Sequence, residues 1–256
     1  LSVFTFPFMA VVQEMCARIG LVTGQGLAAN IRKHYPAWML YAATSLLFVS
    51  NTFNLGADLG AMAKAVQLIF PSAGFGFLVV LFALASLFLQ IFTTYARYAK
   101  YLKYLTLVLL GYVATAFLVH LDWREVFLHT LIPSFDFSRT QLLLICAVLG
   151  TTISPYLFFW QTSQEVEEEI LEGKTTLKSR QEKVPPKTIS RMRTDVWTGM
   201  FFSNAVMFFI IAVSAVTLAS QGITSIESAD QAAEALRPLA GAGAYFLFAL
   251  GIVGTG

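Results

Sequence analysis

The stretch Gly150-Thr151-Thr152-Ile153-Ser154-Pro155-Tyr156 lies in the middle of Thr140–Gln164, a run without charged residues. Pro155 has no amide hydrogen and its ring clashes with the preceding helical turn, so it frees the carbonyl of Thr151, four residues earlier. We therefore expect a non-helical stretch around Thr151–Ser154. Two structures remain open: a broken transporter helix that places loose carbonyls around an ion, or a proline kink satisfied by the Thr and Ser hydroxyls.

The composition around this stretch indicates a membrane protein. The 256 residues carry a formal charge of +2, with 57% hydrophobic residues, 12% charged residues and a mean hydropathy of +0.68. A soluble domain has about 25% charged residues. The composition therefore excludes a cytosolic globular enzyme, a disordered chain and a nucleic-acid binder. Cys16 and Cys146 lie in apolar runs and form neither a disulfide framework nor a zinc pattern.

Runs without charged residues recur along the chain, and a bilayer-spanning helix needs about 20 apolar residues. These runs are continuous and lack the alternation of barrel strands, so the sequence predicts an all-α membrane protein. We expect seven transmembrane segments, at roughly 1–17, 37–68, 77–96, 102–121, 140–164, 196–219 and 238–256. Both chain ends lie inside apolar runs and the first residue is not Met, so we expect an internal fragment of a longer protein.

The distribution of basic residues predicts the orientation of these segments. Thirteen of the 17 lysines and arginines follow the first, third and fifth segments, whereas three follow the second, fourth and sixth. Positive charges favour the cytoplasmic side, so residues 165–195 are predicted to be a cytoplasmic loop of a single transmembrane domain, 1–256. Pro185-Pro186 should end any helix in this loop. The loop is either a solvated connector or an arm that contacts lipid.

Four charged side chains lie in or beside the apolar segments, where a charge at a helix centre costs ~2.5–3.5 kcal/mol. Asp58 and Lys64 belong to segment 37–68, which is longer than a bilayer is thick. They are either functional or exposed in an outer vestibule. Glu14 and Arg18 are four residues apart and can pair on one helix face, as an interfacial anchor or as part of an inner gate.

Several stretches together resemble one transporter family. Gln13–Ala28 contains Ala-Arg-Ile-Gly-Leu-Val-Thr-Gly and is similar to the end of the second transmembrane helix in the NRAMP family of divalent-metal transporters. Asp58 with Ala63–Gln67 looks like the third helix, and Phe201–Asn204 and Ala235–Leu239 look like the seventh and the start of the eighth. The resemblance implies a partial LeuT-like fold with inverted repeats, in which this chain supplies helices two to eight.

On this resemblance, segment 140–164 is the broken sixth helix of the family, whose motif there is Ala-x-x-Met-Pro-His. Thr151 stands at the Ala position and Ser154 at the Met position, so these two residues are the expected metal ligands. The rest of the site-forming break comprises Gly150, Thr152, Pro155 and Tyr156, which replaces the motif's His. Gln161 stands where the family often has a second His, and Asp58 where it has an acidic residue linked to proton movement.

The departures from the family motif change the expected chemistry. Ser154 in place of Met removes a soft ligand, and hydroxyl, carbonyl and water oxygens suit Mg²⁺, Ca²⁺ and Mn²⁺. Tyr156 and Gln161 in place of His remove groups that titrate near neutral pH, which leaves proton coupling open.

We therefore expect a transporter and not an enzyme, with a hard divalent cation such as Mg²⁺ or Mn²⁺ as its substrate. It would work by alternating access without a cofactor, as a multi-pass protein of a bacterial-type plasma membrane. The lipid bilayer is its expected surrounding, and we expect neither a nucleic-acid partner nor an obligate protein partner. The alternative is a LeuT-fold transporter of an organic or Na⁺-coupled substrate.

Overall fold

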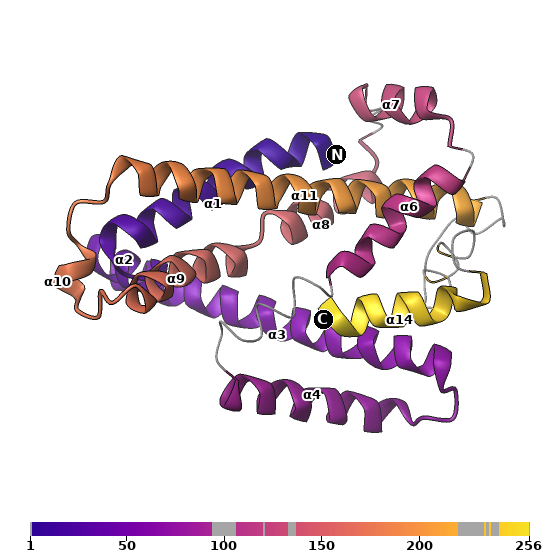
Figure 1. The fold of residues 1–256 in the computed structure, drawn as a ribbon, viewed down its shortest axis with the longest axis horizontal. Coiled ribbons are helices and arrows are strands. Elements are labelled where there is room, and N and C mark those ends of the chain that lie inside the picture. The colour runs from indigo at the N-terminus through magenta and orange to yellow at the C-terminus, as the bar shows by residue number, and fades with distance from the viewer. Residues whose placement is uncertain are drawn as a thin grey trace. The chain divides into compact units, whose positions relative to one another are not determined.

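The computed structural model describes residues 2–93, 106–119, 121–132, 137–219, 233, 236 and 241–255 (Figure 1). Helices make up nearly all of these ranges, which contain no strand, as the apolar runs without alternation predict. In chain order the elements are α1 (Ser2–Thr23), α2 (Leu27–His34), α3 (Ala37–Ile69), α4 (Phe75–Phe92), η1 (Thr106–Leu109), α6 (Leu110–Leu118), α7 (Trp123–Leu131), α8 (Arg139–Thr152), α9 (Pro155–Leu171), α10 (Leu177–Arg180), α11 (Pro186–Ala219), η2 (Gly241–Gly243) and α14 (Ala244–Thr255).

Several helical stretches have the length and apolar character of membrane spans. Within the described residues these are Val3–Thr23, Phe75–Phe92, Arg139–Leu171 and Pro186–Thr217. Only 6% of Phe75–Phe92 is buried inside the protein, and lipid accommodates such exposed apolar surface where water would not. The four stretches overlap four of the seven predicted segments. Segment 37–68 corresponds to α3, while 102–121 and 238–256 extend beyond the described residues.

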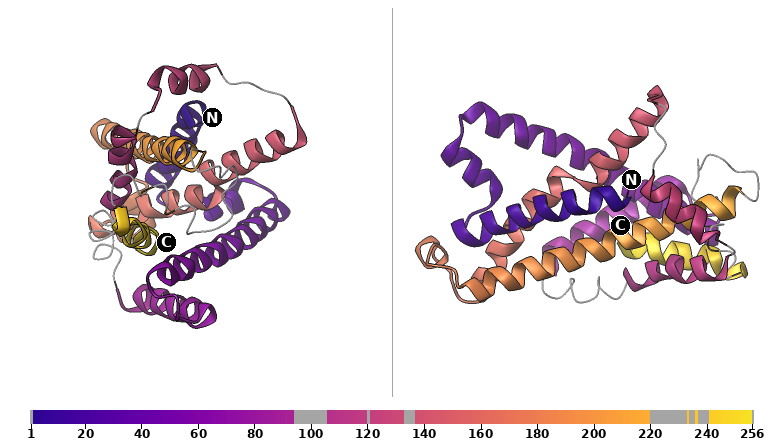
Figure 2. Two further views of the ribbon diagram at one scale, coloured as in Figure 1. Left: turned by 90° about the vertical axis from the view of Figure 1, so that its right-hand side faces the viewer. Right: turned by 90° about the horizontal axis from the view of Figure 1, so that it is seen from above.

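The chain divides into two compact units, and the first comprises Leu1–Asn51 and Leu128–Ala205. In this unit α1 packs along α9 and also contacts α2, α8 and α10. Ala17 and Leu21 of α1, drawn in indigo in Figure 2, pack against Met192 and Val196 of α11, drawn in orange. The first unit thus contains both the predicted helix break and the Glu14–Arg18 pair.

The second unit comprises Thr52–Phe127 and Val206–Gly256 and has its own core. Half of the buried residues in that core are alanines, which allow helices in a membrane to approach closely. Its buried members are Ala65, Tyr112, Ala116, Leu121, Val213, Ala233, Leu236, Ala244, Phe248 and Ala249.

The predicted loop 165–195 is helical at both of its ends. α9 continues to Leu171 and α11 begins at Pro186, so the connection between them is residues 172–185, including α10. As expected, no helix continues through Pro185-Pro186 from the preceding residues, and Pro186 in addition begins α11. A proline is well tolerated in the first turn, where its missing N–H would have had no helical partner.

Candidate functional site

The interruption predicted in segment 140–164 lies between α8 and α9. α8 ends at Thr152, Ile153 has φ −104° and ψ 63°, and Ser154 is extended with φ −88° and ψ 132°. α9 then begins at Pro155. The non-helical backbone is therefore limited to Ile153 and Ser154. It begins two residues later than predicted, since Thr151 and Thr152 are still part of α8.

Ser154 is a buried polar residue at this break, with 2% of its surface exposed. Its position before Pro155 favours extended backbone over helix. Its carbonyl accepts the N–H of Leu157 at 3.1 Å, but its hydroxyl makes no capping hydrogen bond to α9. The break thus holds a buried hydroxyl oxygen, a ligand type that suits hard cations.

The two threonines before the break use their hydroxyls within α8. The Thr151 hydroxyl donates to the carbonyls of Ala147 at 3.0 Å and Val148 at 3.1 Å, and the Thr152 hydroxyl donates to Val148 at 2.7 Å. Such local bonds compete with other roles for a hydroxyl. Thr151, moreover, is exposed, so in this structure only Ser154 of the two predicted ligands is buried. The other predicted break residues that are exposed are Gly150, Pro155 and Tyr156.

Glu14 forms the predicted pair with Arg18 and is the centre of a larger cluster. One carboxylate oxygen lies 2.7 Å from the Arg18 guanidinium. The other accepts the indole N–H of Trp197 at 2.7 Å and lies 3.3 Å from the Arg193 guanidinium. Glu14 is 8% exposed, so α1 is connected to α11 through a nearly buried carboxylate whose oxygens both have partners.

A chain of hydrogen bonds connects Gln13 to Glu165 through Gln161. The Gln13 side-chain amide donates to Gln161 Oε1 at 2.8 Å, and the Gln161 amide donates to a Glu165 carboxylate oxygen at 2.8 Å. Sequence reasoning singled out Gln161 but missed Gln13 and Glu165. Gln13 could have been found as a polar residue within an apolar run. Glu165 could have been found from its four-residue spacing to Gln161, which places both on one helix face.

α1 and α9 approach each other closely just beyond this chain. The Thr162 hydroxyl donates to the Cys16 carbonyl at 3.2 Å. A Cβ atom added to Gly20 would lie 2.5 Å from the Thr162 carbonyl oxygen and 3.1 Å from Glu165 Cβ. Only glycine fits at residue 20 without a shift of one helix relative to the other.

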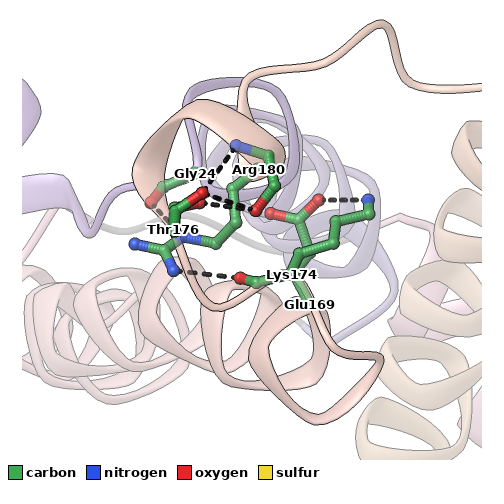
Figure 3. Close-up of polar contacts among 6 residues, drawn as sticks. Gly24, Glu169, Lys174, Thr176 and Arg180 are labelled. Atoms are coloured by element: carbon green, nitrogen blue, oxygen red, sulfur yellow. Dashed lines mark hydrogen bonds and ion pairs between the residues drawn. The ribbon is translucent and has the colours of Figure 1, made fainter.

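Arg180 connects the turn after α1 to the segment after α9 through hydrogen bonds (Figure 3). Its Nε donates to the Gly24 carbonyl at 3.0 Å, and a terminal nitrogen donates to the carbonyls of Lys174 at 3.1 Å and Thr175 at 3.0 Å. Gly24 has a φ of +61°, and a Cβ there would lie 2.5 Å from Arg180 Cβ. Nearby, the Lys174 ammonium pairs at 2.8 Å with Glu169, which is 2% exposed. We call the hydrogen bonds from Arg180 to Gly24, Lys174 and Thr175 the Arg180 clamp.

Asp58 and Lys64 lie on the part of α3 that belongs to the second unit. Both are exposed, and the Lys64 ammonium lies 5.2 Å from the centre of the Phe75 ring. No atom lies within 4 Å of a Cβ added to Gly56 or Gly60, on either side of Asp58. The possible vestibule or proton role of Asp58 remains a prediction.

The described residues contain no group of three His, Cys, Asp or Glu side chains that could hold a metal ion.

A family comparison decides between the possible identities of this helical protein. The model of the Natural resistance-associated macrophage protein-like family, Nramp, matches residues 1–256. The chain belongs to the Nramp family. This confirms the resemblance found in Gln13–Ala28 and the predicted LeuT-like fold class.

Curated Nramp relatives carry the name divalent metal cation transporter MntH. The protein of Caldanaerobacter subterraneus is 25% identical over 253 residues, and that of Aeromonas hydrophila is 25% identical over 254. The Klebsiella pneumoniae protein is 27% identical over 256 residues. Each match covers 96% of this chain but only 56%, 58% and 57% of the respective relative. The chain thus spans somewhat more than half the length of these Nramp transporters.

Proposed function

We propose that the complete protein transports divalent metal cations across a membrane by alternating access, and that its preferred substrates are hard cations such as Mg²⁺ or Mn²⁺. Membership of the Nramp family and the similarity to MntH transporters support the divalent cation. Neither relationship points to an enzyme or to an organic substrate.

The preference for hard cations depends on one observation, the buried Ser154 at the break between α8 and α9. A thioether at this position would select softer metals, whereas a hydroxyl selects harder ones. Mg²⁺ also gives up its water ligands reluctantly, and a short side chain leaves room for a partly hydrated ion. Thr151 would join the site through its carbonyl, because its hydroxyl is bonded within α8. The ion pair of Glu14 and Arg18 would serve as a contact of the inner gate.

The substitution Ser154→Met tests this proposal in the complete protein. We expect the uptake ratio of Cd²⁺ to Mg²⁺ in proteoliposomes to rise, because the new thioether binds the softer ion better. A change of ~1.4 kcal/mol in relative affinity would appear as a tenfold change in this ratio.

Ser50→Met is the matched control, since Ser50 is an exposed residue on α3. It should leave the ratio unchanged. The proposed selectivity is wrong if the wild type already prefers Cd²⁺ and Ser154→Met does not alter that preference. Uptake of an organic solute or Na⁺-driven uptake without any divalent-cation transport would overturn the function itself.

A further inference from the structure

Gln13 has a buried oxygen atom without a hydrogen-bond donor. The side chain is 0% exposed, and the structure gives no partner to Oε1 among the described residues. Its amide nitrogen, in contrast, is used in the bond to Gln161. A buried acceptor without a donor costs free energy, so this oxygen requires an explanation.

The orientation of both glutamine amides follows from the carboxylate at the end of the chain. An ionised Glu165 can only accept hydrogen bonds, so Gln161 must turn its amide nitrogen toward it. Gln161 then presents Oε1 to Gln13, and Gln13 must present its own nitrogen in return. The remaining group of Gln13, its Oε1, is left as an acceptor. Amides in such a chain polarise one another, which makes this terminal oxygen more negative.

We infer that Gln13 Oε1 is a cation subsite, which binds the transported divalent cation directly or through one of the cation's water ligands. This inference rests on the proposed function. A carbonyl-type oxygen is a suitable ligand for hard divalent cations. Glu165 acts as a positioning residue, because it fixes the direction of the hydrogen-bond chain without reaching Gln13 itself.

Protonation of Glu165 reverses this arrangement. A protonated carboxyl can donate to Gln161 Oε1, Gln161 then donates to Gln13 Oε1, and the outermost group becomes the Gln13 amide N–H. An N–H donor repels a cation, so cation binding at Gln13 should weaken as the pH falls. The acidic groups that interact with Glu165 are Glu168 and Glu169 on α9 and Asp195 on α11, while α1 presents Gly20 to it.

The test compares Mg²⁺ binding by wild type, Glu165→Gln and Gln13→Leu in the complete, detergent-solubilised protein. Binding is measured from the rise of the melting temperature with Mg²⁺ concentration, which requires no transport. We expect both variants to weaken Mg²⁺ binding on the order of tenfold, because contacts to charged groups are stronger than neutral ones. Gln13→Leu removes the oxygen that contacts the cation, and Glu165→Gln removes the charge that fixes the direction of the hydrogen-bond chain. Glu165→Gln disturbs the fold less than Gln13→Leu does, since a glutamine at residue 165 can still form a hydrogen bond with Gln161.

Glu167→Gln is the control, because it removes the same charge from an exposed position on the same helix. It should bind Mg²⁺ as the wild type does and retain the fall in affinity at acidic pH, which Glu165→Gln should lose. The inference fails if Glu165→Gln binds Mg²⁺ with wild-type affinity and pH dependence. If the wild type binds neither Mg²⁺ nor Mn²⁺, the proposed function fails, and the inference fails with it.

Discussion

At the scale of single residues, Glu14 is the most connected carboxylate described in the first unit. Replacing it with Gln should destabilise the protein by about 1–3 kcal/mol, because hydrogen bonds to a charged group are lost in a nearly buried place. Arg18→Gln should cost less than ~1 kcal/mol, since the Arg18 side chain is 48% exposed. Urea unfolding in detergent measures both. Equal effects of the two variants would contradict a central role for Glu14.

The Glu14 cluster also shows which contacts a sequence can predict. The pair with Arg18 follows from the helical repeat, because residues four apart share a face. Trp197 is 183 residues from Glu14 in sequence, and nothing local indicates this contact. The same holds for Gln13 and Gln161, which are 148 residues apart. The sequence shows that Gln13 and Gln161 are polar residues within apolar runs. Which residues they contact depends on how α1 packs against α9 and α11.

At the scale of helices, the close approach of α1 and α9 at Gly20 limits what these elements tolerate. Gly20→Ala should destabilise the protein by ~1–3 kcal/mol, because the new methyl group overlaps the backbone of α9. Gly56→Ala on α3 is the control, since nothing lies within 4 Å of its added Cβ. It should be neutral or stabilising by up to ~1 kcal/mol. The melting temperatures of both variants, compared with that of the wild type, test this prediction. An unchanged melting temperature of Gly20→Ala would show that α1 and α9 can move apart without cost.

Helix breaks were predicted well in kind and less well in position. Pro155 made a break in segment 140–164 predictable, because its effect on the backbone is local. The break begins two residues late because proline restricts mainly the residue directly before it, and the Ile153 N–H still bonds to the Leu149 carbonyl at 2.8 Å. The start of α11 at Pro186 was not predicted, since a proline can begin a helix as well as end one. The surrounding structure decides between these outcomes.

At the scale of the whole molecule, the bias of basic residues predicts that the connection between α9 and α11 faces the cytoplasm. A cysteine introduced at Glu182, an exposed position in this connection, should react only with membrane-permeant reagents in intact cells. Mass spectrometry after labelling measures this. Modification by an impermeant reagent would reverse the proposed orientation.

The fold class could be predicted from sequence, because the long apolar runs and the motif in Gln13–Ala28 are direct signals. The candidate site could be predicted only in part. Ser154 and the break follow from local chemistry, whereas the chain from Gln13 to Glu165 and the contacts of Arg180 require the packed structure.

The Arg180 clamp has a consequence for the timing of biosynthesis. Gly24 and Arg180 are 156 residues apart, and a ribosome adds about 5–20 residues per second. Roughly 8 to 30 s therefore pass between the synthesis of the turn after α1 and that of the side chain that holds it. During this interval the Gly24 carbonyl lacks its arginine partner, although α1 is already complete. The end of α1 is thus fixed by this contact only after α2 to α9 have been synthesised.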